Sequence, residues 1–86
     1  MNEDALRKGR KADQLINDEV FSAVLEKMRN DQYWVFESSK PEESAKRELA
    51  WSMLKAIENF KIEVTKMVDN GKVAQRAIER AQKNLV

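Results

Sequence analysis

The side chains that could support acid–base or nucleophilic chemistry in this chain are its carboxylates and its serines. Glu42, Glu43 and Glu48 lie close together in the sequence, and paired carboxylates can act as general acid and base when one of them sits in an apolar pocket. The sequence offers these three no such pocket, and helix capping explains the first two. The chain has no His and no Cys, so its serines have no imidazole base and there is no thiolate nucleophile. We therefore expect no catalytic residues.

The same absences bear on metals and cofactors. A chain without Cys or His lacks the usual ligands of structural zinc and cannot form a disulfide framework. Its two glycines are too few for a glycine-rich phosphate loop. We expect no metal, no cofactor and no small-molecule substrate, and hence a protein that is not an enzyme.

Aromatic residues are a second group with a possible function. They could form a stacking platform or a protein-binding hot spot, although core packing is the commoner use of such a cluster. A hairpin that turns near Pro41 would bring Trp34 and Phe36 close to Trp51. Successive helical residues point in different directions, so residues 33–36 cannot all face one neighbour and at least one should be exposed to a partner. The protein-interface candidates are Tyr33, Trp34, Phe36, Trp51, Phe60 and Met67.

Basic residues gather toward the two ends of the chain. Residues 1–16 carry a net charge of +1, residues 17–71 a net charge of −3 and residues 72–86 a net charge of +3. Such side chains could contact phosphates or simply form solvated helix faces. The isoelectric point near 8.0 is below the value of about 9 that is typical of nucleic-acid-binding domains, which favours solvated faces. The nucleic-acid candidates are Arg7, Lys8, Arg10, Lys11, Lys72, Arg76, Arg80 and Lys83.

The elements that position these residues are predicted to be helices. Ala, Leu, Glu, Lys, Arg, Gln and Met dominate the long stretches between the few Gly and Pro residues, and these are strong helix formers. The sequence therefore predicts an all-α fold, a helical hairpin or small bundle. One helix is expected over residues 18–37, with Asn17 or Asp18 as its N-cap.

A longer central helix is predicted over residues 41–69. Pro41 would lie in its first turn, and Ser39 and Glu42 have the spacing of a capping box. Within it, one apolar stripe advances by three or four residues at a time, as expected for an amphipathic helix. The stripe consists of Ala45, Leu49, Met53, Ile57, Phe60, Val64, Met67 and Val68.

Gly71 is expected to end the central helix, because glycine at that position readily adopts the left-handed conformation of a C-terminal cap. A short basic helix over residues 72–85 would follow. At the other end of the chain, residues 1–10 could form a mobile basic arm or a frayed helix. The whole chain, residues 1–86, is expected to form a single helical domain.

The predicted lengths favour self-association. A central helix of about 29 residues has a longer apolar stripe than a preceding helix of about 20 residues can cover. The end of the stripe from Val64 to Val68 would be left for the last helix, the N-terminal arm or another subunit. Domains of this size often gain stability by oligomerisation, so we expect a homo-oligomer.

The sequence gives no sign of membrane insertion. Its longest apolar run, Tyr33 to Phe36, has four residues, whereas a bilayer-spanning helix needs about 20. No charged segment followed by an apolar one opens the chain. We expect no membrane association and a cytoplasmic location.

Three stretches of sequence resemble a known group of proteins. They are KADQLINDEVF (Lys11 to Phe21), SSKPEESAKRELAW (Ser38 to Trp51) and VDNGKVA (Val68 to Ala74). They are similar to small, mostly uncharacterised helical proteins encoded among bacteriophage head and packaging genes. The resemblance covers roughly residues 10–75 and consists of capping and turn signals. It implies a phage or prophage origin, a virion or assembly role, other phage proteins as partners, and a location in the host cytoplasm or the virion.

Two functional hypotheses follow from these observations. The first is a non-enzymatic phage structural or assembly protein that acts through helix-mediated self-association and protein–protein contacts. The second is a nucleic-acid-associated accessory protein, active in packaging or regulation, that uses the basic N-terminal cluster and the basic C-terminal helix. The first is favoured because the chain has more apolar and aromatic residues than one hairpin can bury.

Overall fold

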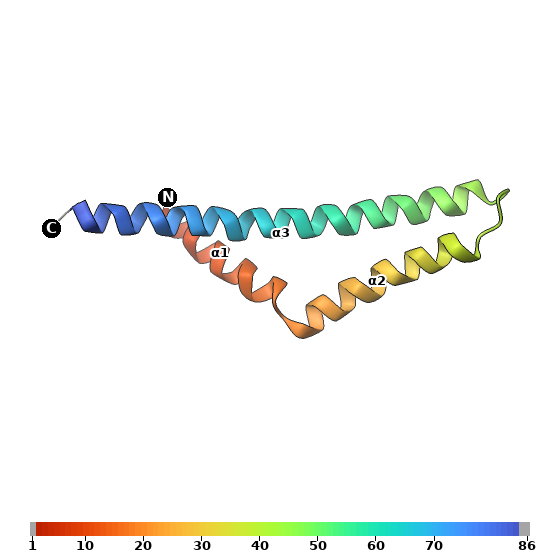
Figure 1. Ribbon diagram of the computed structural model, residues 1–86, viewed down its shortest axis with the longest axis horizontal. Coiled ribbons are helices and arrows are strands. Elements are labelled where there is room, and N and C mark those ends of the chain that lie inside the picture. The colour runs from red at the N-terminus through yellow and green to blue at the C-terminus, as the bar shows by residue number, and fades with distance from the viewer. Residues whose placement is uncertain (1, 85–86) are drawn as a thin grey trace.

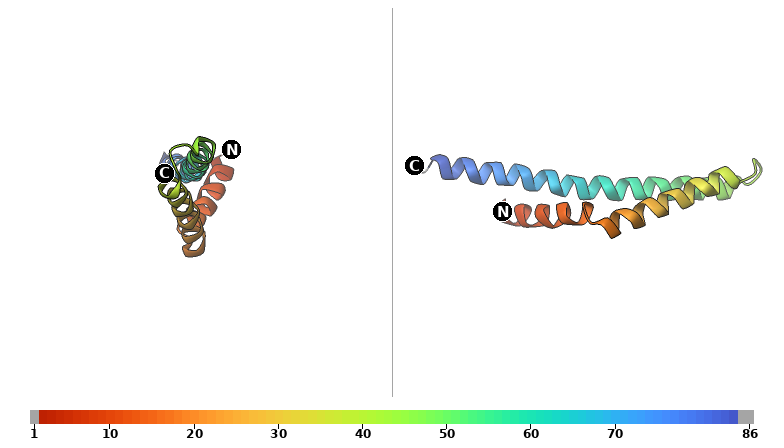
Figure 2. Two further views of the ribbon diagram at one scale, coloured as in Figure 1. Left: turned by 90° about the vertical axis from the view of Figure 1, so that its right-hand side faces the viewer. Right: turned by 60° about the horizontal axis from the view of Figure 1, so that its bottom comes forward.

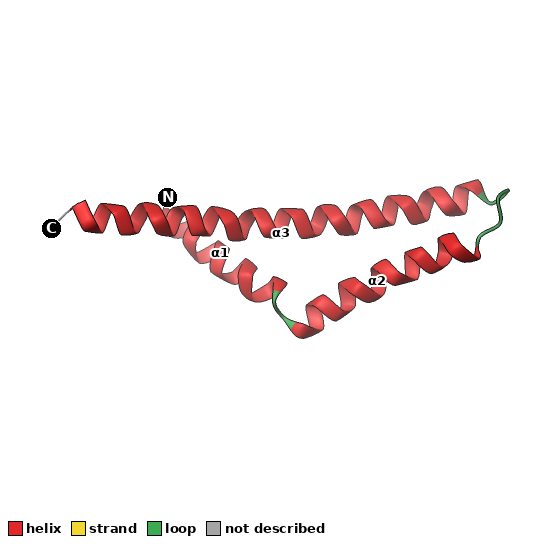
Figure 3. Ribbon diagram, viewed as in Figure 1, coloured by secondary structure: helices red, strands yellow, loops and turns green. Residues whose placement is uncertain are grey.

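The chain forms three helices joined by two short connections. The computed structural model describes residues 2–84, and within that range it contains α1 (Asn2–Ile16), α2 (Glu19–Ser38) and α3 (Ser44–Asn84) and no strand (Figure 1 and Figure 3). The prediction of an all-α fold is confirmed.

The molecule is elongated because a single helix, α3, extends along most of its long axis. The 41 residues of α3 span about 62 Å at 1.5 Å per residue. α1 lies along the C-terminal half of α3 and α2 lies along its N-terminal half, so the two short helices follow one another on the same side (Figure 1 and Figure 2). The radius of gyration is 19.0 Å, compared with about 12 Å for a compact chain of this length.

The start of α2 agrees with the sequence-based expectation. Asp18 is the N-cap, and its carboxylate accepts a hydrogen bond of 2.8 Å from the backbone amide of Phe21. This bond satisfies one of the unpaired amides at a helix N-terminus. The predicted helix over residues 18–37 is confirmed to within one residue at each end.

The connection between α2 and α3 differs in detail from the prediction. Pro41 lies in the turn before α3 and not in the first turn of the helix. The predicted capping box of Ser39 and Glu42 is wrong: the Ser39 hydroxyl donates to the carbonyl of Phe36 at 2.7 Å, and it is Glu43 that accepts from the amide of Lys40 at 2.9 Å. The hydrogen bond from a backbone amide back to a glutamate, which a capping box requires, thus forms one residue later than predicted.

The predicted break at Gly71 is also wrong. α3 continues through this residue to Asn84, so the expected helices over 41–69 and 72–85 are one helix as far as the structure describes the chain. No described residue, glycine included, has a positive φ angle. A left-handed C-cap is therefore absent at Gly71, and the glycine has another function.

That function is a close crossing of two helices. A Cβ atom built on Gly71 would lie 2.8 Å from the Cα atom of Gly9 in α1, and one built on Gly9 would lie 2.6 Å from the Cα atom of Gly71. Contacts this short to backbone atoms do not occur for real side chains. α1 and α3 can reach this separation only because both positions lack a side chain.

α1 decides between the two alternatives, a mobile basic arm and a helix, that the sequence left open for the N-terminal residues. Residues 2–10 are helical and pack on α3 through Gly9. Farther along α1, Ala12 is buried with Val64 and Val68 of α3, and Ile16 packs against this group. The segment from Val64 to Val68, which the shorter hairpin helix could not cover, is thus covered by α1.

The face of α3 that meets the other helices follows a seven-residue repeat. Its buried residues Ala50, Ile57, Val64 and Gly71 are each seven positions apart. This spacing places them on one line along the helix. The core is thin, because its buried residues are no larger than Val or Ile and no large side chain in the described chain is fully buried.

The glycine crossing makes a clear prediction for Gly71→Ala. In an unpacked helix this change would stabilise the protein by about 1 kcal/mol, because Ala is the better helix former. Here we expect the free energy of unfolding to fall by about 1–3 kcal/mol, as for other overpacked sites. The measurement is urea unfolding followed by circular dichroism at a fixed protein concentration.

Asn59→Ala is the matched control. Asn59 is exposed on the same helix, so the substitution should leave stability unchanged or raise it slightly. A Gly71→Ala protein that is more stable than the wild type would show that α1 and α3 do not cross closely at this position.

Candidate protein-interaction surface

A second line of apolar residues runs along α3 beside its buried face. Leu49, Met53, Ala56, Phe60 and Met67 follow one another in steps of four, three, four and seven residues, the spacing of a second heptad seam. All five are exposed. We call this line the outer seam. Glu63 lies in the same line between Phe60 and Met67 and makes the outer seam polar at that point.

Residues of α1 and α2 widen the outer seam on the same side of the molecule. The rings of Phe60 and Phe21 of α2 lie with their centroids 5.9 Å apart and their planes at 43°, a tilted geometry that is favourable for aromatic pairs. Met67 lines an apolar groove of about 290 Å³ together with Leu15 of α1. Phe60 and Met67 are seven residues apart and therefore lie on the same side of α3. Phe21 and Leu15, which lie beside them, extend one continuous apolar face.

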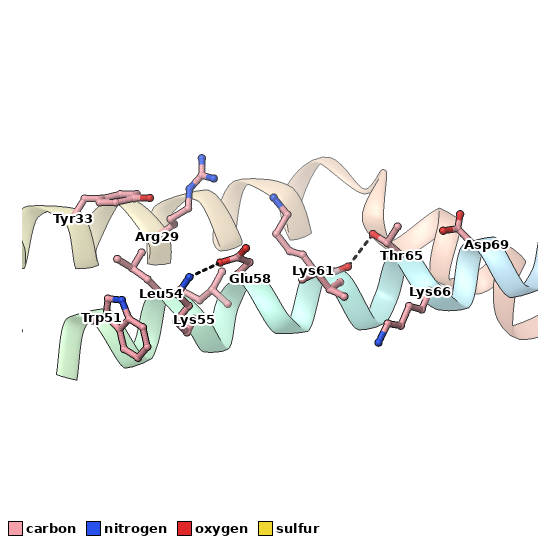
Figure 4. Close-up of a pocket in the computed structure, with 12 residues that line it drawn as sticks. Arg29, Tyr33, Trp51, Leu54, Lys55, Glu58, Lys61, Thr65, Lys66 and Asp69 are labelled. Carbon is pink, nitrogen blue, oxygen red and sulfur yellow. Dashed lines mark hydrogen bonds and ion pairs between the residues drawn. The ribbon is translucent and has the colours of Figure 1, made fainter. Parts of the chain in front are cut away.

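The opposite flank of α3 forms a larger groove with α2, which we call the aromatic groove. It has a volume of about 780 Å³ and is lined by apolar and charged side chains from both helices. Tyr33 and Arg29 come from α2, and Trp51 and Leu54 come from α3 (Figure 4). Farther along α3, the wall is formed by charged and polar residues such as Lys61, as Figure 4 shows.

Most of the charges around the aromatic groove are paired within their own helix. Lys55 bonds to Glu58 at 3.5 Å and also lies 5.7 Å from the ring of Trp51. On α2, Nη2 of Arg29 donates to both carboxylate oxygens of Glu26 at 3.0 and 2.9 Å, while its Nε is buried without a hydrogen-bond partner. Such exposed pairs contribute little to stability, and they leave the groove with no strong charge of either sign.

The sequence-based interface candidates are distributed over both sides. Phe60 and Met67 belong to the outer seam, whereas Tyr33 and Trp51 line the aromatic groove. Trp34 is 67% exposed, which confirms that the aromatic run of α2 presents a large side chain to the surface. Phe36 is half-buried. Tyr33 lines the aromatic groove together with Trp51, and Trp34 is not among the groove residues.

Sequence reasoning missed Leu15, Phe21 and Leu49 as surface candidates. It assigned Leu49 and Met53 to a single stripe together with Ile57 and Val64, although the structure separates the first two from the buried pair. The signal was present, because the single stripe is too wide for one heptad seam and divides into two lines of seven-residue spacing. The position of Phe21 depends on how α2 docks, which the local pattern does not encode.

The basic candidates come together at one end of the molecule. Arg10 of α1 and Lys72 of α3 line the same small hollow beside the glycine crossing, with a volume of about 120 Å³. The remaining basic candidates with a described side chain are exposed. We call the region around Arg10 and Lys72 the basic end. Asp13 also lines this hollow, whereas Lys8 and Lys11 line the groove beside Met67.

Part of this positive charge is neutralised within α1. Asp4 accepts a hydrogen bond of 2.8 Å from Arg7 and lies 3.0 Å from Nζ of Lys8. The hydrogen bond from Arg7, followed by that from Lys8, lowers the pKa of Asp4 below its usual value. Asp4 therefore stays ionised at neutral pH and offsets one of the two basic neighbours.

Residues 2–84 contain neither a metal-binding cluster nor a membrane-spanning helix. No group of three His, Cys, Asp or Glu side chains in this part of the chain is arranged to hold a metal ion. None of its helices is long and apolar enough to cross a membrane.

Comparison with known proteins adds no relatives. No family model, no curated protein and no solved structure matches this chain.

Exposure of the aromatic run predicts that Trp34 is dispensable for folding. Trp34→Ala should change the free energy of unfolding by about 0.5 kcal/mol or less, as for other surface substitutions. Ile57→Ala, at a residue that is only 6% exposed, should cost about 2–4 kcal/mol. Urea unfolding of the two variants measures the difference. Equal losses of stability would mean that Trp34 belongs to the core.

Proposed function

We propose that this protein is a non-enzymatic structural or assembly protein that acts through helix-mediated self-association and contacts with other proteins. The observation that carries the proposal is the outer seam. Its large members are Leu49, Met53, Phe60 and Met67, and they lie on one line of a long helix whose other face already holds α1 and α2. A regular row of this kind is typical of a helix that pairs with a further helix.

The thin core supports the same proposal. The described chain buries only Ala, Val, Ile and Gly residues, while its largest apolar side chains stay partly in water. Small domains with little buried apolar surface commonly gain stability by oligomerisation. A second chain on the outer seam would bury the side chains that the three helices leave exposed.

The proposed setting is bacteriophage assembly. It rests on the similarity of three sequence stretches to small helical proteins encoded among phage head and packaging genes. In that setting the partners are further copies of this chain and other phage proteins, and the location is the host cytoplasm or the virion.

Self-association through the outer seam is tested by the mass in solution. Light scattering should give a multiple of the monomer mass of 10.0 kDa, and the multiple should persist in high salt because apolar contacts are not screened. Phe60→Asp should shift the mass toward the monomer, since it places a charge in the middle of the seam.

Val73→Asp is the control for this experiment. Val73 is 61% exposed on α3, compared with 48% for Phe60, but it lies off the outer seam. Its substitution should leave the oligomer intact. A wild-type protein that is monomeric at all salt concentrations would contradict the proposal, as would equal effects of the two variants.

One observation favours a second function, binding of a nucleic-acid backbone. Arg10 and Lys72 line one hollow although they come from opposite ends of the sequence. The exposed basic residues Arg76 and Arg80 lie farther along the same helix. Together they form a basic end that could follow a line of phosphates.

The second function predicts a steep dependence on salt. A short DNA duplex should bind at low salt and dissociate as the salt concentration rises, because phosphate contacts release counterions. The double substitution of Arg76→Glu and Arg80→Glu should abolish the interaction, which fluorescence anisotropy of a labelled duplex measures. Binding that is absent at low salt, or unchanged in the double variant, would rule out this function for the basic end.

A further inference from the structure

The charges of this elongated molecule are sorted along its length. Residues 17–43, which include α2 and the loop before α3, carry seven acidic and three basic side chains, a net charge of −4. Residues 2–16 and 72–84 lie toward the other end (Figure 1) and carry eight basic and four acidic side chains, a net charge of +4. The molecule is therefore strongly dipolar although the whole chain carries only +1.

The outer seam lies between these two charged regions. It extends along α3 from Leu49, beside the acidic half, to Met67, beside α1. A second copy could place its own α3 along this seam in either direction. A parallel arrangement would bring the two acidic halves together and the two basic ends together, which is unfavourable, whereas an antiparallel arrangement brings opposite charges together.

We propose that two copies of this chain pair in an antiparallel orientation, with the outer seam of one α3 packed against the outer seam of the other. This inference rests on the proposed function, because it specifies the partner and the geometry of the same surface. An antiparallel pair of identical helices has two-fold symmetry, so each copy uses the same residues and the interface is closed.

The side chains of the outer seam favour one register. A two-fold axis near residue 58 places Phe60 of one copy opposite Ala56 of the other, and Leu49 opposite Met67. The large ring then faces a small side chain at the centre, which allows the two helices to interdigitate without a void. Glu63 interrupts the seam opposite Met53 of the second copy, and its carboxylate pairs with Lys66 of its own helix at 3.1 Å.

The same register aligns opposite charges at the ends of the pair. Residues beyond Gly71 extend past the start of the second copy's α3 and reach the level of the loop that precedes it. That loop contains the exposed Glu42 and the partly exposed Glu43. The basic end of each copy thus lies at the level of the acidic half of the other, and this occurs twice in the symmetric pair.

Spin labels on single cysteines test the orientation directly, because the chain has no native Cys. Ala45, Asn59 and Val73 are exposed on α3 and are spaced by 14 residues, so they share one face and differ only in their position along the helix. The variants are Ala45→Cys, Asn59→Cys and Val73→Cys. Double electron–electron resonance measures the distance between labels on different copies.

The antiparallel register gives a distinct distance for each label. At 1.5 Å per residue, two labels at position 45 should be about 40 Å apart and two at position 73 about 45 Å apart. Two labels at position 59 should be close together. A mixture of copies labelled at 45 and copies labelled at 73 should add a short distance that neither sample shows alone.

The three variants also separate failure of this inference from failure of the proposed function. Short distances at all three positions would show a parallel pair, which overturns the antiparallel orientation and leaves self-association intact. Absence of any intermolecular distance at position 59, together with a monomeric mass, would overturn both. Long distances at 45 and 73 with a short one at 59 support the antiparallel pair.

Discussion

The backbone contact between Gly9 and Gly71 is the constraint on which the rest of this structure depends. A Cβ atom at either position would clash with the Cα atom of the other, so the separation of α1 and α3 is set by the absence of two side chains. This crossing holds α1 against the distal half of α3, where Ala12 meets Val64 and Val68. It also explains why a glycine lies inside a helix, where it costs about 1 kcal/mol relative to Ala.

The thin core is a consequence of this arrangement. α1 and α2 lie one after the other along α3 (Figure 1), so most positions of α3 meet one neighbouring helix and not two. Small residues such as Ala50 and Ala74 fill the inner face, while larger side chains such as Phe60 stay at its edge. An open arrangement of three helices thus leaves a regular apolar row in water. The proposed second copy would supply the layer that the single chain lacks.

Sequence reasoning succeeded where the cause of a structural feature is local. The all-α fold follows from composition, and the start of α2 follows from the cap that Asp18 forms with the amide of Phe21. It failed at Gly71, because a glycine that ends a helix and a glycine that admits another helix look alike without knowledge of the partner. The surface candidates show the same limit. Exposure of at least one large side chain in the aromatic run was correctly expected, and Trp34 is such a side chain. The division of the apolar stripe into inner and outer lines depends on where α1 and α2 dock.

The contact of Gly9 with Gly71 can be observed directly by nuclear magnetic resonance of the isotopically labelled protein. The structure predicts a nuclear Overhauser effect between the α protons of Gly9 and Gly71, together with helical chemical shifts at Gly71 and at its neighbours on both sides. Absence of that cross-peak, with shifts and couplings at Gly71 that indicate a positive φ angle, would contradict the structure. In that case α3 would end at Gly71, and the arrangement of α1, the outer seam and the basic end would all have to be revised.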